Sequence, residues 1–445
     1  MKRPNILLIM ADQLRADWLG CSGNDLVRTP HMDRLAEEGT RFVRASCNSP
    51  LCAPSRASIA CGLYPYRTGV LNNEVNYPDD LTTYYQLLRR AGYRVGLVGK
   101  TDLHKPIHFY GRNGDIPFLY HLGFTDIHET EGKVNAAQFQ RYEFRREAAE
   151  ERPVGPYQRY LKAKGLLDRF VSDYRHRADE ATVWHARRSV LNAEDYHDSY
   201  IGRMACEFLS RVDKESPWHA FVSFVGPHDP WDAPDEYAAV YEETRFPEAV
   251  HDEMREKPGW IRERRRTRTG DVTEDRIQEV RRHYSGMVTL IDSWIGRIIE
   301  TLEKRHLLAN TVVILTSDHG EMLGDHGLFQ KQVMYEPSLR VPLIIRDPAA
   351  GPGANGGSSE SHALAELVDL FPTILDYAGV EYESSRAAGM SLVPVVRNAG
   401  EADTNRGRCT GRNGVHKELQ YAELENTRMV FDGPVSYTHL RAHET

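Results

Sequence analysis

Four short, mainly apolar runs constrain the fold of this chain more than any other feature. They cover residues 5–10, 93–98, 218–224 and 311–316. Runs of this length suit β-strands that are buried on both faces, as in a parallel sheet covered by helices. We therefore expect an α/β protein with a large, mostly parallel sheet.

Polar residues come after each of these runs. In chain order they are Asp12 and Gln13, Lys100 and His104, His228, and Asp318 and His319. Parallel strands place such residues at the carboxyl edge of the sheet, where α/β proteins bind ligands. Acidic residues also cap helices and lysines mostly lie on surfaces, so each signal is weak by itself. His228 is stronger, because prolines on both sides of His228-Asp229 fix a rigid loop.

The stretch 51–62 reads as a loop that leads into a helix. Pro54 suits the first helical turn, which places Cys52 at the helix mouth. Free backbone N–H groups and the helix dipole favour an anion there, and Arg56 adds a positive charge. From the residues alone, a reactive cysteine and a buried structural cysteine are equally good interpretations.

The run Cys52-Ala53-Pro54-Ser55-Arg56 resembles the Cys-x-Pro-Ser-Arg signature of the sulfatase family, a branch of the alkaline phosphatase superfamily. The similarity continues in the family's order from Asn5 to about Asp432. It implies a mostly parallel sheet sandwiched by helices and a smaller C-terminal α+β subdomain. It also implies that a formylglycine-generating or sulfatase-maturating enzyme converts Cys52 to Cα-formylglycine. Cys61 stands where the family commonly has threonine.

The resemblance also implies the residues of the site. One divalent cation would be held by Asp12, Gln13, Cys52, Asp318 and His319. Oxygen ligands favour Ca²⁺, with Mg²⁺ or Mn²⁺ as alternatives. The hydrated formylglycine would attack sulfur with one hydroxyl, and the other would later expel sulfate. Arg56 would orient the hydrated formylglycine, and Lys100, His104, His228 and Lys331 would bind the sulfate oxygens, with His104 or His228 protonating the leaving alkoxide.

Three functions are compatible with this pattern. The first is a sulfuric ester hydrolase that cleaves a sulfated small molecule or glycan to alcohol and sulfate. The second is a phosphonate monoester or phosphodiester hydrolase of the same superfamily, because those substrates are also singly charged tetrahedral anions. The third is a non-catalytic anion-binding protein in which Cys52 stays unmodified.

We expect three segments along the chain. Residues 1–378 would form the catalytic α/β domain, with a charged and aromatic insertion at about 128–194. The insertion could select substrates or could be a solvated decoration. Residues 379–434 would begin a truncated C-terminal subdomain, and 435–445 resemble a translated sequencing adapter. Helices are expected at about 276–305 and 364–378.

The composition restricts the classes of partner and the cellular location that we expect. The net charge of −8 gives no electrostatic case for nucleic acid. The basic block 262–268 reads as a solvated face, or as a contact to an anionic substrate. No apolar run is long enough to span a membrane, and the N-terminal run is too short for a secretory signal. Six scattered cysteines then suggest reduced thiols, and we expect a cytoplasmic protein.

Overall fold

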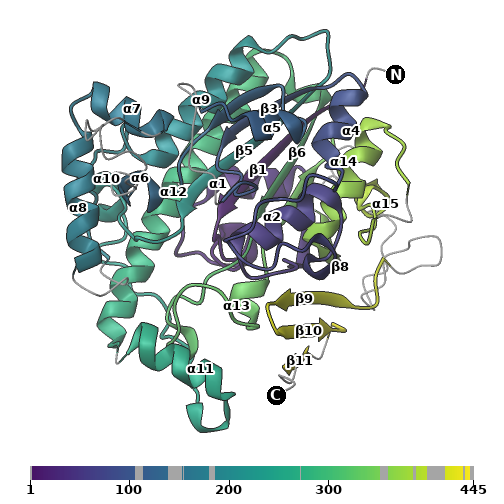
Figure 1. Cartoon of the computed structure of the whole chain (residues 1–445). Coiled ribbons are helices and arrows are strands. Elements are labelled where there is room, and N and C mark those ends of the chain that lie inside the picture. Colours follow the sequence, from purple (N-terminus) through teal and green to yellow (C-terminus); the bar gives the residue numbers. More distant parts are fainter. Residues whose placement is uncertain are drawn as a thin grey trace, which may run out of the picture.

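The computed structural model describes residues 3–105, 114–138, 153, 155–179, 186–270, 272–350, 359–383, 387–397, 416–433 and 436–440. An eight-stranded sheet with the order β4-β3-β5-β1-β6-β7-β2-β8 forms its centre (Figure 1). The strands are β1 (Asn5–Asp12), β2 (Thr40–Ser46), β3 (Arg94–Gly99), β4 (Asp126–Glu129), β5 (Trp218–Pro227), β6 (Thr311–Ser317), β7 (Leu343–Arg346) and β8 (Ser359–Glu366).

The sheet is mostly parallel, as the sequence predicts. β1 pairs in parallel with β5 on one side and β6 on the other, with Ile9 opposite both Val222 and Leu315. β7 runs antiparallel to its neighbours β6 and β2. The four predicted runs are therefore the adjacent strands β3, β5, β1 and β6, and their carboxyl ends lie at one edge.

Helices cover both faces of the sheet. Successive residues of β1 alternate between two cores: Leu7 and Ile9 pack on the side of α12 (Glu274–Lys304), whereas Ile6 and Leu8 pack on the side of α2 (Cys52–Cys61) and α14 (Leu370–Ala378). Successive side chains of a strand point to opposite faces of the sheet, so this alternation shows that β1 is buried on both faces. The helices are α1 (Pro30–Glu37), α2 (Cys52–Cys61), α3 (Pro65–Thr68), α4 (Tyr84–Arg90), α5 (Pro117–His121), α6 (Asn135–Gln138), α7 (Pro156–Ala163), α8 (Leu167–Asp179), α9 (His197–Arg211), α10 (Asp235–Ala239), α11 (Gly259–Arg264), α12 (Glu274–Lys304), α13 (Glu336–Leu339), α14 (Leu370–Ala378) and α15 (Val393–Arg397).

One predicted helix begins later than expected. Residues 364–366 belong to β8, which pairs in parallel with β2, and α14 starts only at Leu370. The pairing with β2 satisfies the backbone of this apolar stretch, so its hydrophobic pattern alone does not separate strand from helix. A reciprocal capping contact between Glu366 and Asp369 marks the change of direction.

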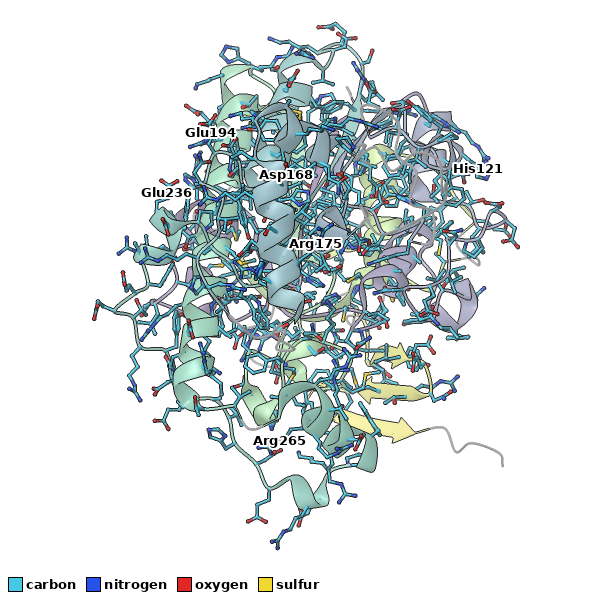
Figure 2. All side chains as sticks on the ribbon, turned by 60° about the vertical axis from the view of Figure 1, so that its left-hand side comes forward. His121, Asp168, Arg175, Glu194, Glu236 and Arg265 are labelled. Atoms are coloured by element: carbon cyan, nitrogen blue, oxygen red, sulfur yellow. The ribbon has the colours of Figure 1, made fainter. Side chains whose placement is uncertain are left out.

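The insertion has a small core of its own. Tyr157 and Leu161 of α7 pack together with Phe170 and Tyr174 of α8. With the left of Figure 1 turned forward, Figure 2 shows α8 running along the outside of the molecule, with Asp168 and Arg175 labelled beside it.

A second, three-stranded antiparallel sheet lies near the C-terminus. It is formed by β9 (Gln420–Leu424), β10 (Thr427–Phe431) and β11 (Ser436–Leu440), and β11 falls in the segment that resembles an adapter. The proposed domain boundaries stay predictions. No helix in the described ranges is both long and apolar enough to cross a membrane.

Candidate active site

The strand order brings the predicted residues to one place. β3, β5, β1 and β6 are neighbours, so Lys100, His228, Asp12 and Asp318 follow or end adjacent strands at the same edge. α2 is tied to this edge because the hydroxyl of Ser55 donates to the backbone carbonyl of Asp318 at 2.6 Å. All ten residues of α2 are buried. Cys52, its first residue, therefore lies inside the site and not at the surface.

Four buried residues form what we call the inner cluster: Asp12, Cys52, Asp318 and His319. Their ligand atoms all lie within 4.8 Å of one another. Cys52 Sγ is 3.1 Å from His319 Nε2 and 3.8 Å from Asp12 Oδ1. The site thus places a sulfur, an imidazole nitrogen and two carboxylates around one point.

His319 presents a lone pair to this cluster. Its Nδ1 lies 3.0 Å from the carbonyl oxygen of Gly320, which can only accept, so Nδ1 carries the proton. Burial lowers the pKa of His319 and keeps the ring neutral. Nε2 is then free to act as a ligand.

Two cations hold the carboxylates of the inner cluster. Arg56 donates from Nε to Asp318 Oδ2 at 2.8 Å and lies 3.4 Å from Asp12 Oδ2, while Lys100 pairs with Asp12 Oδ2. Burial opposes ionisation of Asp12, but the charges of Lys100, His228 and Arg56 outweigh it and hold the pKa of Asp12 well below its usual range. Asp102 also pairs with Lys100, at 2.9 Å.

The inner cluster fits a divalent cation. Asp12 Oδ2 is held by Lys100, which leaves Oδ1 turned toward Cys52 and His319. Two ionised carboxylates offset the charge of a divalent ion, and hard oxygen donors with one nitrogen suit Ca²⁺, Mg²⁺ or Mn²⁺. The residues present are therefore chemically suitable ligands.

Gln13, His228, Asp229 and Lys331 form a second group, the outer cluster. Lys331 donates to the side-chain oxygen of Gln13 and contacts Nε2 of His228. The side-chain amide of Gln13 lies 3.4 Å from Asp229 Oδ1. Gln13 has a positive φ of 70°, and its backbone N–H donates to Asp318 at 3.0 Å. The outer cluster therefore joins the inner one through Gln13, whose role as a metal ligand stays a prediction.

His104 lies apart from these contacts. Its Nε2 is 2.9 Å from Glu129 Oε1, and the backbone N–H of Thr101 donates to the same oxygen at 3.0 Å. Glu129 ends β4, beside the end of β3. His104 is thus fixed near Lys100, while its contact with sulfate stays a prediction.

Glu321 has no role predicted from the sequence, although it comes soon after the Asp318-His319 pair. Its buried carboxyl accepts from the backbone N–H of Leu323 and of Gln330, and from the side chain of Gln13. Burial raises the pKa of Glu321 to about 7. Glu321 thereby ties the segment that carries Lys331 to the end of β6.

Lys133 is a second residue that no sequence pattern indicated. Its ammonium donates to the carbonyl oxygens of His228, at 3.3 Å, and Pro230, and pairs with the buried Asp232 at 2.5 Å. Tyr196 donates to Asp232 at 2.8 Å. Lys133 comes from the insertion, so the insertion holds the loop of His228 directly.

The fold and the site define an alkaline-phosphatase-like α/β enzyme. The sulfatase family model matches residues 4–380, and the chain belongs to the sulfatase family.

The chain is similar in sequence to several named sulfatases and similar in structure to a phosphonate monoester hydrolase. The chain is 31% identical to a choline-sulfatase of Rhizobium meliloti over 415 residues, which cover 88% of this chain and 72% of that protein. It is 29% identical to an N-acetylglucosamine-6-O-sulfatase of Bacteroides thetaiotaomicron, over 90% of this chain and 72% of the relative. A solved phosphonate monoester hydrolase from Silicibacter pomeroyi is similar with a TM-score of 0.75 and 26% identity, covering 99% of this chain and 88% of the other.

Proposed function

We propose that this enzyme hydrolyses a sulfate ester to an alcohol and sulfate, with Cys52 converted to Cα-formylglycine beside a divalent cation. The observation that carries the proposal is the position of Cys52, buried at the first turn of α2 and 3.1 Å from His319. The formylglycine would supply the nucleophile, and the cation, with Ca²⁺ the first candidate, would neutralise negative charge next to it. Asp12, Gln13, Asp318 and His319 would hold the cation together with residue 52.

The remaining side chains have separate tasks in this proposal. Arg56 orients residue 52 through its hold on the neighbouring carboxylates. Lys100, beside the inner cluster, and Lys331, in the outer cluster, bind the negatively charged oxygens of the ester. Each contributes roughly 10²–10³-fold to the rate if it is preorganised. His228 directs Nε2 toward the site because its Nδ1 donates to the carbonyl of Asp229 at 2.7 Å. His228 or His104, when doubly protonated, would donate a proton to the leaving oxygen and become neutral.

A phosphonate monoester or phosphodiester is the second candidate substrate. Such an ester resembles a sulfate monoester because both carry a single negative charge on a tetrahedral centre. The likeness to the phosphonate monoester hydrolase supports it, as does the carboxamide of Gln13 in place of a charged ligand. The named relatives make choline sulfate and a 6-O-sulfated glucosamine reasonable first substrates of the sulfate-ester class.

The test has two stages. The chain is coexpressed with a formylglycine-generating enzyme, and the mass of the peptide that contains Cys52 is measured. We expect an aldehyde in place of the thiol, and a peptide that keeps its thiol under these conditions would contradict the proposal. The converted protein is then assayed with an aryl sulfate, an aryl phosphodiester and an aryl phosphonate, and the largest kcat/KM identifies the ester class. The Cys61→Ala variant is the matched control, because Cys61 ends the same helix.

A further inference from the structure

The basic block noted in the sequence lies against the loop that carries Lys331. We call Arg262–Arg268 the arginine segment; it spans the end of α11 and a π-helical turn at Arg265–Thr269. Figure 1 shows α11 at the lower edge of the molecule, at the opposite end from the N-terminus, and Figure 2 labels Arg265 there. A small apolar cluster anchors the segment: Ile261, Met322, Leu328 and Val333.

Hydrogen bonds connect the arginine segment to the outer cluster. Arg264 donates to the backbone carbonyl of Lys331 at 2.6 Å and to Gln332 Oε1 at 3.0 Å. Arg268 lies 3.4 Å from Gln330 Oε1, and the amide of Gln330 donates to Asp229 Oδ2 at 3.1 Å. One side chain, Gln330, therefore separates Arg268 from the outer cluster.

The charges of the arginine segment are poorly neutralised. Arg266 pairs with Glu263 at 2.6 Å, but no carboxylate in the described part of the chain forms an ion pair with Arg264, Arg265 or Arg268. Burial and the nearby Arg268 lower the pKa of Arg264 to about 10. By contrast, the buried Arg56 and Arg15 each contact two carboxylates. Like charges held together without counterions favour the binding of an anion.

We propose that Arg264, Arg265 and Arg268 form a second anion subsite at the rim of the active site, which binds an additional sulfate or carboxylate group of the substrate. Guanidinium groups suit this task because they bind such groups through paired N–H donors. The inference rests on the proposed ester hydrolysis and narrows it to esters whose leaving group is itself anionic. A cationic leaving group such as choline is then disfavoured, in contrast to the choline-sulfatase relative.

The first experiment compares matched esters with the converted wild-type protein. The three substrates are phenyl sulfate, 3-carboxyphenyl sulfate and 3-(trimethylammonio)phenyl sulfate. We expect kcat/KM for the carboxylated ester to exceed that for phenyl sulfate by roughly tenfold at low salt, and the cationic ester to be the poorest. The advantage should shrink severalfold near ~0.5 M salt, because salt screens exposed charges. Sulfated benzyl alcohols that carry either a sulfate or a carboxylate as the second group would then show which of the two anions the subsite prefers.

The second experiment uses variants of the segment itself. We expect the R265Q/R268Q double variant to lower the ratio of the two aryl ester kcat/KM values at least ~5-fold. R266Q is the matched control, since Arg266 is exposed and already paired with Glu263. Equal ratios in wild type and double variant, or an equal loss in R266Q, would overturn the subsite.

A binding measurement separates this inference from the proposed function. Calorimetry with the C52A variant needs no turnover, and it compares 3-carboxyphenyl sulfate with phenyl sulfate. Tighter binding of the carboxylated ester that disappears in C52A/R265Q/R268Q supports the subsite even where no ester is cleaved. Absence of that difference overturns the subsite, whereas failure to cleave any ester with converted Cys52 overturns only the proposed hydrolysis.

Discussion

The inner and outer clusters share one site but are held in different ways. Asp12 and Asp318 are fully buried on adjacent strand ends, and Arg56 and Lys100 from within the same edge neutralise them. Lys331 and His228 lie on longer loops, and His228 keeps 19% of its side-chain surface exposed. These loops are fixed from outside, by Arg264 of the arginine segment and by Lys133 of the insertion.

This difference indicates a division of tasks. A cluster on strand ends is rigid because the sheet sets its spacing, and this suits a cation and a nucleophile that need fixed geometry. The geometry of a cluster on loops depends instead on the peripheral elements that pack against those loops. Substitutions in the inner cluster should therefore affect both stability and chemistry, whereas those in the outer cluster should affect chemistry more than stability.

The largest effect is expected for D318N. The variant leaves Arg56 buried with its closest ionic contact weakened, and breaking a buried pair costs roughly 3–5 kcal/mol. Turnover should fall by more than ~10³-fold because the proposed cation loses one of its ligands. Urea unfolding and kcat/KM measure the two effects, with D25N as control because Asp25 is exposed. A D318N protein as stable and as active as wild type would contradict the expectation that the inner cluster contributes to both stability and chemistry.

K331M comes next. Removing this ammonium should lower kcat roughly 10²–10³-fold, because a preorganised contact to the ester's oxyanion is lost. Stability should change by less than about 1 kcal/mol, since methionine keeps the apolar stem. Stopped assays and thermal unfolding check this expectation, and K257M is the control on a half-exposed lysine outside the site. A stability loss as large as that of D318N would show that the two clusters do not differ.

K133M tests the support from the insertion. Lys133 is a positioning residue for the His228 loop, so we expect kcat to fall roughly tenfold while KM changes less than about threefold. K164M, on the surface of the same insertion, should leave both parameters unchanged. Equal changes in kcat and KM for K133M, or none, would argue against positioning of His228 from this side.

The smallest expected effect is a pH dependence of the local stability of the insertion. Glu131 is buried and accepts from the backbone N–H groups of Tyr157 and Gln158, and burial raises its pKa to about 7 from 4.5. The folded state thus holds the proton more tightly than the unfolded state. This stabilisation is complete below about pH 4.5 and is lost as the pH rises through about 7.

Hydrogen exchange of α7 across this range measures the loss, which we expect to be roughly 1–3 kcal/mol of local stability in wild type. E131Q should remove the pH dependence, and E194Q, at an exposed position of the same insertion, should keep it. An identical pH profile in wild type and E131Q would contradict the assignment.

The sequence by itself determined the sheet and placed Asp12, Asp318 and His319 at its carboxyl edge, whereas the assignment of Cys52 to the same site came from the resemblance to the sulfatase family. Buried parallel strands have a local apolar signal, and the geometry of such a sheet places the residues after Ile9, Leu97 and Leu315 at one edge. The helix that begins at Cys52 also agrees with its local residues, since Pro54 and the small side chains around it fit a buried first turn. These inferences need only the order of residues along short segments.

Only the tertiary structure showed which further side chains support the site. Lys133, Glu321 and Arg264 reach the site through contacts between segments far apart in the chain, and no local pattern encodes which loop packs on which. The same reason explains the late start of α14, where pairing with β2 selected a strand from an apolar run that a helix would also fit. Long-range packing therefore decided the contacts that support the outer cluster and the position of the arginine segment, whereas local sequence indicated the strand ends on which they converge.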